Sequence, residues 1–198
     1  MLRRKNSPVF VALIGLLLTI SVNVSAKKKD EFPSVNIKNF GQMDDRFYRG
    51  AQPKEGDYQS LADLGINTVI DLRQDPESYE KRSVESLGMK YVNIPMSDTI
   101  YPPQEQIDQF LKLVDDPATG KFFVHCAGGR HRTGVMGAVY RFNHYKWTYD
   151  QVYSEMKDYD FYTRFGHGEM KRFVQDYAQK FDTNAINAAA VTATTKAQ

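Results

Sequence analysis

The sequence is poor in cysteine, with one, Cys126, among 198 residues. A single cysteine excludes an intramolecular disulfide, and with it the small disulfide-stapled scaffolds. No internal repeat is present, which excludes solenoid and propeller architectures. The hydrophobic fraction of 41% and the aromatic fraction of 13% exclude an intrinsically disordered chain. The length is sufficient for one domain with its own hydrophobic core.

Long hydrophobic runs are also missing. The apolar stretch from Val9 to Val22 is shorter than the roughly 20 residues that a membrane-spanning helix needs. It follows the basic residues 3–5 and precedes the small residues Val24-Ser25-Ala26, which is typical of a secretory signal peptide. We therefore predict that residues 1–26 are a signal peptide cleaved after Ala26. The mature protein is then exported, periplasmic or secreted, with no stable membrane span. The alternative is a retained membrane anchor.

An excess of charge of one sign is missing as well. The formal net charge is +2, but Arg3, Arg4 and Lys5 lie in the predicted signal peptide, and without them the charge is −1. The basic isoelectric point of the precursor therefore gives no reason to expect nucleic acid as a partner. A lone thiol in an oxidising compartment is open to oxidation.

Helical and strand patterns alternate along the rest of the chain. This predicts a single α/β domain at residues 45–182, with a central, mostly parallel sheet flanked by helices. Residues 27–44 are expected to form an N-terminal leader with a short strand at 35–40, and residues 183–198 a disordered tail. Hydrophobic periodicity and cap residues predict strands at 47–49, 66–72, 90–94 and 121–125, and helices at 57–64, 78–87, 103–114, from Thr133 onward, 149–159 and 170–181.

The stretch from His125 to Gly134 carries the strongest chemical signal. Cys126 is followed by five residues and then Arg132, between a predicted strand and a predicted helix. Glycines at such a place let backbone N–H groups turn toward a bound anion, and the helix N-terminus adds its positive dipole end. We call residues 126–132 the phosphate loop. The residues expected to bind phosphate are Ala127, Gly128, Gly129, Arg130, His131 and Arg132.

Each polar residue around the phosphate loop has an expected role. The field of the loop lowers the pKa of a thiol placed there, so Cys126 is the candidate nucleophile. Arg132 presents a planar fork that can hold two phosphate oxygens. Thr133 is placed to donate its hydroxyl to the Cys126 sulfur and stabilise it as a leaving group. His125 is expected to orient the loop without touching the substrate.

These residues match His-Cys-x-x-Gly-x-x-Arg-Thr-Gly, and the stretch resembles the signature of the protein tyrosine phosphatase superfamily. Residues 32–181 resemble its compact dual-specificity type, with looser similarity at Phe47–Pro53 and Leu64–Arg73. The resemblance implies a phosphatase that hydrolyses phosphomonoesters through a cysteinyl-phosphate, with no metal and no cofactor.

The resemblance also implies a general acid on a loop upstream of the cysteine. Asp98 follows a predicted strand, within Ile94–Thr99, where a site at the carboxyl edge of the sheet would need it. Cys126, Arg132, Asp98 and Thr133 are therefore the candidate catalytic residues. The alternative for Asp98 is a turn or helix-capping aspartate. The Trp-Pro-Asp sequence of larger members is missing, so this assignment rests on position alone.

The substrate stays open between a phosphorylated protein and an inositol or lipid phosphate. Arg130 and His131 make the loop basic, which goes with highly phosphorylated substrates among members of the superfamily, unless these side chains point to solvent. Arg49 and Arg73 are expected to pair with carboxylates of the scaffold. A phosphate-binding pseudophosphatase and a sulfur-transferring rhodanese-like domain are the alternatives from other functional classes.

Overall fold

The computed structural model describes the backbone of residues 27–28 and 31–195 and the side chains of residues 31–181. The predicted signal peptide lies outside the described residues. The centre of the molecule is a six-stranded sheet in the order β1-β2-β3-β6-β4-β5. The strands are β1 (Lys27–Lys28), β2 (Gly41–Gln42), β3 (Phe47–Ala51), β4 (Thr68–Asp71), β5 (Lys90–Asn93) and β6 (Phe122–Cys126).

The four neighbouring strands β3, β6, β4 and β5 are parallel, whereas β1 and β2 lie together at one edge and pair antiparallel, which confirms the expected mostly parallel sheet. β6 lies between β3 and β4, with Ala51 opposite Cys126 and Asp71 opposite His125. The carboxyl ends of three parallel strands therefore meet beside the cysteine. In parallel α/β sheets this edge is where ligands bind.

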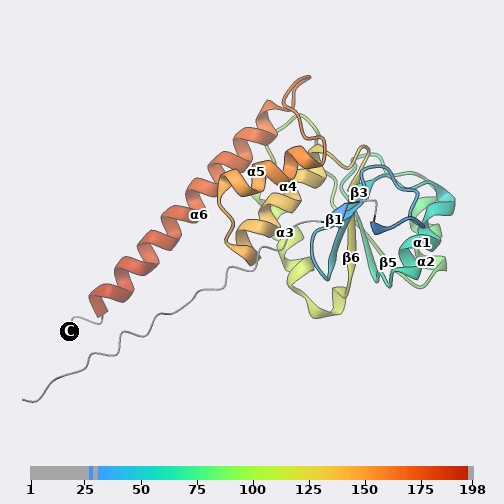
Figure 1. Cartoon of the computed structure of the whole chain (residues 1–198), viewed down its shortest axis with the longest axis horizontal. Coiled ribbons are helices and arrows are strands. Elements are labelled where there is room, and N and C mark those ends of the chain that lie inside the picture. Colours follow the sequence, from blue (N-terminus) through green and yellow to red (C-terminus); the bar gives the residue numbers. More distant parts are fainter. Residues whose placement is uncertain (1–26, 29–30, 196–198) are drawn as a thin grey trace, which may run out of the picture.

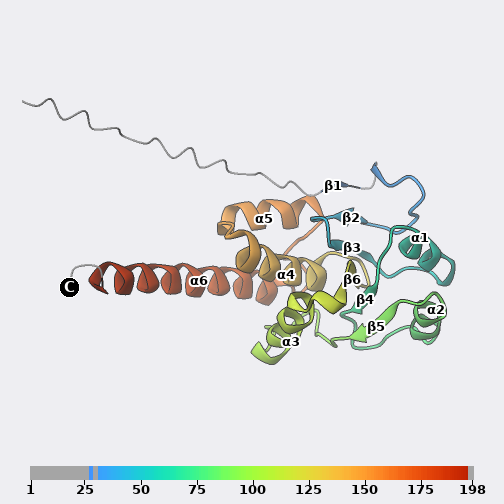
Figure 2. The ribbon, with the colours of Figure 1, turned by 90° about the horizontal axis from the view of Figure 1, so that it is seen from below.

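Helices cover both faces of the sheet (Figures 1 and 2). α1 (Tyr58–Asp63) and α2 (Glu80–Ser86) lie on one face. The other face is covered by α3 (Gln104–Asp115), α4 (His131–Tyr140), α5 (Tyr149–Asp158) and α6 (Gly168–Thr195). A π-helical turn, Arg141–Tyr145, continues α4, and 3-10 turns occur at Glu55–Asp57 and Pro117–Thr119.

The alternation of side chains along β6 explains why both layers are needed. Phe122 and Val124 belong to the core beneath α3–α6, whereas Phe123 belongs to the core beneath α1 and α2. Successive side chains of a strand point to opposite faces, so a continuous apolar run is stable only when both faces are covered.

The cap residues end and begin helices where the sequence indicates. Pro103 precedes α3, and Thr148 and Gln151 form the predicted capping box at the start of α5, with the Thr148 N–H donating to Gln151 Oε1 at 2.9 Å. α4 begins at His131, two residues before the predicted start, because the phosphate loop curls directly into the helix.

The strand predicted at residues 35–40 is wrong. Val35, Ile37 and Phe40 are buried, as their alternation suggested, but the segment runs through turns and pairs with no strand. Asn39 has a φ of 56°, in the left-handed region, which interrupts extended backbone. Alternating burial here reflects packing on the α1/α2 side of the sheet, not strand pairing.

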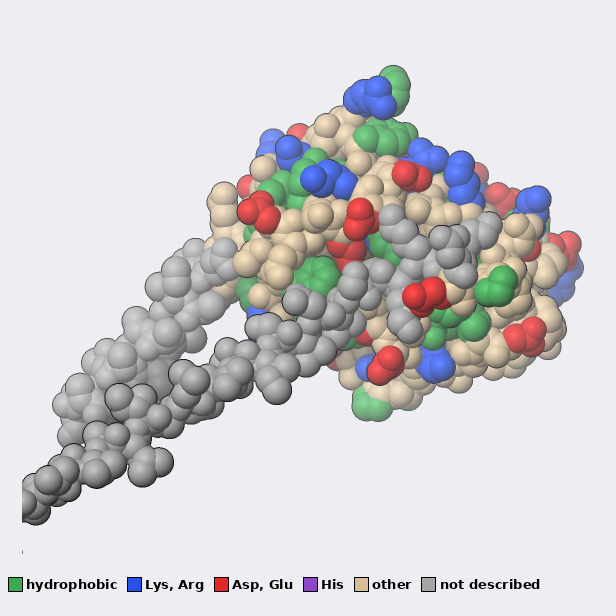
Figure 3. Space-filling model, viewed as in Figure 1, with side chains coloured by type: hydrophobic (Ala, Val, Ile, Leu, Met, Phe, Trp, Pro, Cys, Tyr) green, Lys and Arg blue, Asp and Glu red, His purple; other side chains and the backbone are tan. Residues whose placement is uncertain are grey.

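The tail also differs from the prediction, because α6 continues as helix to Thr195. The alanine-rich sequence after residue 183 lacks a bulky apolar stripe, but alanine has the highest intrinsic helix propensity, and an existing helix extends easily. α6 projects beyond the body of the molecule (Figures 1 and 2). Within the described chain, no helix combines the length and the apolar character needed to cross a membrane. On the face in Figure 3, acidic and basic side chains are interspersed.

Candidate active site

The phosphate loop connects the end of β6 to the start of α4, as the sequence predicts. Gly129 has a φ of 65°, and a Cβ at this position would collide with the backbone of Gly50 and Ala51 on β3. Only glycine meets both conditions without strain. The loop can therefore lie directly against the neighbouring strand.

Scaffold donors hold the carbonyl groups of the phosphate loop. The Gly129 carbonyl accepts hydrogen bonds from Arg49 Nη2 at 2.7 Å and from Asn39 Nδ2 at 3.0 Å. The Ala127 carbonyl accepts from the Gln52 N–H at 3.3 Å. In a trans peptide the C=O and the N–H point in opposite directions, so fixing these carbonyls outward leaves the N–H groups that follow them facing the pocket. This is the arrangement that binds an oxyanion.

The thiol of Cys126 is buried at the base of the loop, with 3% of its surface exposed. Burial alone would raise its pKa. The Thr133 hydroxyl, the charge of Arg132 and the backbone N–H groups of Thr133 and Arg130 outweigh burial and hold the pKa below its usual value. The Thr133 hydroxyl is itself buried and has no other hydrogen-bond partner, so it is free to stabilise the sulfur. The thiolate form of Cys126 is therefore more favoured than that of an ordinary cysteine.

A pocket of about 380 Å³ opens over the thiol. Asp98, Cys126 and Arg132 all line it, so three of the four predicted catalytic residues share one cavity, with Thr133 beneath. Arg132 also donates from Nη1 to the Met96 carbonyl at 3.2 Å. This bond connects the phosphate loop to residues 95–99, which we call the acid loop.

Arg130 and His131 both line the pocket, but they differ in charge and setting. The guanidinium of Arg130 lies over the Tyr162 ring, 5.7 Å from its centroid. Burial, then the neighbouring charges of His167 and Arg130, lower the pKa of His131 to about 4. His131 is therefore neutral near pH 7, and of the two only Arg130 adds positive charge.

Three pocket residues carry no signal in the sequence: Lys38, Tyr162 and His167. Lys38 comes from the segment before β2, and the other two come from the connection between α5 and α6. We call residues 161–167 the rim loop. No motif or spacing marks these residues, because they meet the phosphate loop only through the tertiary fold.

The comparison with known families shows which family the chain belongs to. Residues 25–176 match the family described as DSP-PTPase phosphatase fused to NAD+ kinase. The chain belongs to this family. It is therefore a dual-specificity-type member of the protein tyrosine phosphatase superfamily and hydrolyses phosphomonoesters.

Curated relatives of the phosphatase include proteins named as tyrosine phosphatases and proteins named as inositol diphosphatases. "Probable tyrosine-protein phosphatase DG1060" of Dictyostelium discoideum is 28% identical over 155 residues, which is 75% of this chain and 88% of the relative. "Inositol diphosphatase DSP2" of Oryza sativa subsp. japonica is 25% identical over 154 residues, which is 75% of this chain and 72% of the relative.

Solved structures share the fold of the phosphatase. P. aeruginosa TpbA has a TM-score of 0.64 at 20% identity, over 78% of this chain and 91% of that chain. The catalytic core of the PP-IP phosphatase SIW14 from S. cerevisiae, in complex with citrate, has a TM-score of 0.61 at 21% identity. The match covers 70% of this chain and 85% of that chain. The likeness at these identities concerns the α/β fold.

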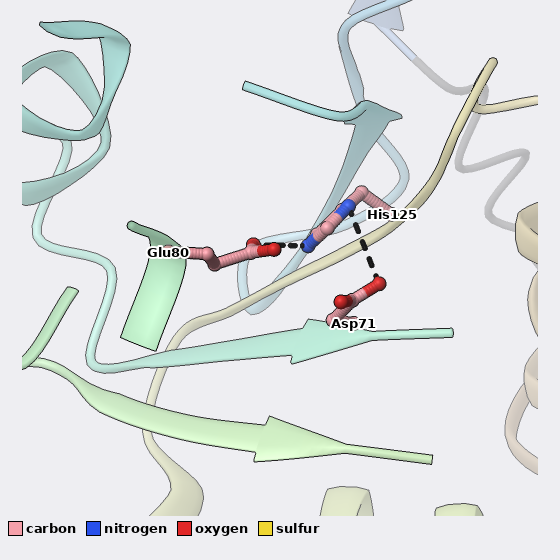
Figure 4. Close-up of side chains that lie close together, drawn as sticks. All are labelled: Asp71, Glu80 and His125. Carbon is pink, nitrogen blue, oxygen red and sulfur yellow. Dashed lines mark ion pairs between the residues drawn. The ribbon is translucent and has the colours of Figure 1, made fainter. Parts of the chain in front are cut away.

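Behind the phosphate loop, His125 lies between two buried carboxylates of the phosphatase, and all three side chains have no exposed surface (Figure 4). Its Nε2 is 2.8 Å from Glu80 Oε1, and its Nδ1 is 3.8 Å from Asp71 Oδ1. Burial raises the pKa of Asp71, and His125 offsets this only in part. Burial would also raise the pKa of Glu80, but the contact with His125 holds it below its usual value.

One ligand atom from each of these three residues lies within 4.8 Å of the others, close enough for a cation, and the second oxygen of each carboxylate already has a protein donor. Gln52 donates to Glu80 Oε2 at 3.0 Å, and Tyr91 donates to Asp71 Oδ2 at 3.1 Å. The arrangement fits a rigid support for His125, and its orienting role stays a prediction.

The two scaffold arginines behave differently. Arg73 donates to Glu77 Oε1 at 3.0 Å, as expected for a carboxylate partner. Arg49 is 1% exposed and lies over the Tyr159 ring, 3.9 Å from the centroid, while its Nη2 binds the Gly129 carbonyl. The expected carboxylate pairing of Arg49 is therefore not what the contacts show. Arg49 supports the phosphate loop from behind.

Proposed function

We propose that this phosphatase is an exported enzyme in which Cys126 is the nucleophile, Arg132 the phosphate clamp, Asp98 the general acid and Thr133 the group that stabilises the sulfur. The observation that carries the proposal is the single pocket that Cys126, Arg132 and Asp98 line together. The lowered pKa of the Cys126 thiol supports its role, because the thiolate is the nucleophilic form.

In the first step the Cys126 thiolate attacks phosphorus in line with the ester oxygen. An S–P bond forms while the P–O bond to the leaving group breaks, and protonated Asp98 gives its proton to the departing oxygen. Arg132 and the loop N–H groups hold the equatorial oxygens, where charge develops in the transition state.

In the second step water replaces sulfur on phosphorus. The Asp98 carboxylate takes a proton from the attacking water, an O–P bond forms and the S–P bond breaks. The Thr133 hydroxyl stabilises the sulfur as it leaves with the bonding electrons. Inorganic phosphate departs, and Cys126 returns to the thiolate while Asp98 is again protonated.

The test of the proposal uses phosphate release from aryl phosphates by the reduced protein. We expect Cys126→Ser to lose turnover. In rapid-quench experiments with the unmutated protein, we expect Cys126 to be found as the cysteinyl-phosphate. Unchanged hydrolysis in Cys126→Ser contradicts the mechanism. Phosphate binding without any turnover by the reduced protein indicates a pseudophosphatase, and thiocyanate formation from thiosulfate and cyanide indicates sulfur transfer.

The two candidate substrate classes are phosphotyrosine proteins and multiply phosphorylated inositols. The pocket offers a specific reason to consider the inositols. Lys38 and Arg130 line the pocket beside Arg132, so two further cations are available for phosphate groups next to the one being cleaved. The names of the inositol diphosphatase relatives support this candidate. The phosphotyrosine candidate is supported by a TpbA variant solved in complex with pTyr, which shares the fold with a TM-score of 0.57.

A panel of phosphopeptides and inositol phosphates separates the two classes. If the substrate is a polyphosphorylated inositol, kcat/KM for Lys38→Ala and Arg130→Ala falls on that class and changes little on phosphotyrosine peptides. Equal losses on both classes contradict a recognition role for these two cations.

Export is proposed from the N-terminal sequence alone. The basic residues 3–5, the apolar stretch and the small residues before Lys27 support it. Mass spectrometry of the protein recovered from the periplasm or the medium should give a mature chain that begins at Lys27. A full-length chain that stays in the cell contradicts the proposal.

A further inference from the structure

We propose that His167 is a positioning residue that holds the acid loop where Asp98 can deliver its proton. The inference rests on the proposed role of Asp98 and adds to it the group that fixes the acid in place. His167 belongs to the rim loop, and it acts through the backbone of Asp98 without contact with the reacting atoms.

The first observation is the hydrogen bond between the two loops. Nδ1 of His167 lies 2.7 Å from the carbonyl oxygen of Asp98. A carbonyl oxygen can only accept, so the ring must carry its proton on Nδ1, and this contact selects the tautomer. His167 is 9% exposed, so its side of this part-buried bond is largely shielded from competing water.

The second observation is the stacking of His167 on the phosphate loop. Its ring lies parallel to that of His131, with 3.6 Å between the centroids and 14° between the planes. The Tyr162 ring is inclined steeply to both rings, at 83° to His131 and 69° to His167, with its centroid 4.4 Å from that of His131 and 5.5 Å from that of His167. His167 therefore has one ring contact with the phosphate loop and one hydrogen bond to the acid loop.

Two further contacts hold the acid loop, one from the phosphate loop and one from the rim loop. Arg132 holds the Met96 carbonyl from the phosphate loop, at 3.2 Å. Gly166, with a φ of 88°, packs so closely that a Cβ would lie 3.2 Å from the Thr99 methyl group. The acid loop is thus held at Met96, Asp98 and Thr99, while the Asp98 side chain stays exposed and lines the pocket.

The consequence concerns proton transfer and not substrate binding. A general acid contributes about 10²–10⁴-fold to rate only when it is within hydrogen-bond reach of the leaving oxygen. An ester whose leaving group is already a stable anion needs little of this help. A defect in acid positioning must therefore grow as the leaving group becomes more basic, and it must leave KM nearly unchanged.

The experiment compares kcat/KM on a series of aryl and alkyl phosphates that differ in leaving-group pKa. This ratio reports the step in which the leaving group departs. His167→Phe keeps a ring for the stack and loses the Nδ1–H donor. His167→Asn keeps an N–H donor near the position of Nδ1 and loses the ring. His144→Asn is the matched control, because His144 lies in the π-helical turn at the far end of α4 and pairs with Asp115.

We expect His167→Phe to lose about tenfold or more on alkyl phosphates and less than about twofold on 4-nitrophenyl phosphate, because only the former depend on the acid. His167→Asn should recover part of the loss, and His144→Asn should match the parent. Adding His167→Phe to Asp98→Asn should cause no further loss on alkyl phosphates, because the two changes remove the same contribution.

The outcomes distinguish this inference from the role of Asp98 itself. If Asp98→Asn shows no dependence on the leaving group, the assignment of Asp98 as acid fails. If Asp98→Asn shows it and His167→Phe does not, the positioning role of His167 is wrong. A loss that is equal on all substrates in His167→Phe and His167→Asn also overturns the inference, since it indicates a general structural role.

Discussion

At the scale of single residues, Thr133 shows how a side chain tunes the nucleophile. Its buried hydroxyl opposes the effect of burial on Cys126, together with the charge of Arg132. A hydrogen bond to a charged group contributes about 1.5–3 kcal/mol, which is enough to change the thiolate population by tenfold or more. Thr133 therefore affects both the formation of the thiolate and its departure in the second step.

We predict that Thr133→Ala raises the pKa of Cys126 and shifts the acidic side of the kcat/KM profile to higher pH. The sign follows because the thiolate is lost as pH falls through that pKa, and a higher pKa means an earlier loss. At pH values below the parent's pKa the rate should fall by about tenfold. The rate of alkylation by iodoacetamide as a function of pH measures the pKa directly, because the chain has no other cysteine.

Thr133→Ser is the control for this prediction, because it keeps the hydroxyl and removes only a methyl group. It should leave the profile near that of the parent. An unchanged alkylation profile in Thr133→Ala would show that the other donors alone determine the thiolate.

Gly129 offers a second prediction at this scale. Alanine there would adopt a left-handed φ and meet the backbone of β3, so Gly129→Ala should lower the free energy of unfolding by about 1–3 kcal/mol and impair phosphate binding. Chemical denaturation and phosphate titration measure both effects. Gly56→Ala is the matched control, because open space surrounds Gly56, and it should change stability by less than about 0.5 kcal/mol.

At the scale of elements, the position of the end of β6 depends on its contact with α2. Glu80 from α2 and Asp71 from β4 enclose His125, one residue before the nucleophile. Contacts among β4, β6 and α2 therefore fix the direction in which the chain enters the phosphate loop. A buried polar group of this kind is costly to leave without its partner.

We predict that Glu80→Gln lowers the free energy of unfolding at neutral pH by about 3 kcal/mol, because it removes one member of a buried pair. The pKa of Glu80 is lowered in the folded state, so its contribution is present above the usual Glu range and is lost as pH falls. The difference from the parent should therefore shrink in acid. Urea unfolding at several pH values measures this.

Glu85→Gln on the same helix is the control, since Glu85 is exposed and its nearest cation, Lys81, is 3.9 Å away. Surface ion pairs contribute about 0–1 kcal/mol, so its effect should be small at every pH. Equal effects of the two substitutions would contradict a special role for the buried cluster.

The same elements show what sequence patterns can predict. Apolar runs and cap residues predict β4, β6, α3 and α5 within a few residues, because burial and capping are local properties of the chain. The phosphate loop is predictable because its chemistry needs Cys126, Arg132 and the glycines close together in sequence. Asp98 could be proposed from its place after β5.

The remaining parts of the site come from contacts over long distances in the chain. Asn39 and Arg49 support the phosphate loop from 80 or more residues upstream, and His167 reaches Asp98 from 69 residues downstream. No local pattern encodes these contacts. The strand expected at 35–40 failed for a related reason, because alternating burial does not distinguish pairing from packing on a sheet face.

At the scale of the whole molecule, the described side chains of α6, up to Phe181, attach the helix to the domain. Met170, Phe173, Val174 and Ala178 are buried in the core beneath α3–α6, and Phe181 packs against Phe142. The helix continues to Thr195 beyond the body of the molecule (Figure 2). The described core contacts of α6 thus come from the part of the helix nearest the site.

We predict that ending the chain after residue 183 leaves kcat/KM and the melting temperature nearly unchanged. Ending it after His167 removes the buried side chains of Met170, Phe173 and Val174, each worth about 1.5–3 kcal/mol, and the smaller one of Ala178, and should prevent folding. Thermal unfolding and activity of the two truncated proteins measure this. Loss of activity in the longer protein would indicate a role for residues 184–198 in the domain.

The donors that hold the phosphate loop also determine at what stage of folding the Cys126 thiol becomes reactive. Asn39 binds the carbonyls of both Gly129 and Tyr159, so the loop is fixed only after segments from both ends of the domain have come together. In the unfolded chain Cys126 is an ordinary thiol, because the donors that lower its pKa are not arranged around the sulfur. The nucleophile is therefore a product of completed folding, and the lone cysteine can serve as a kinetic reporter. Its alkylation rate should rise in the last phase of refolding, when the two ends of the domain meet.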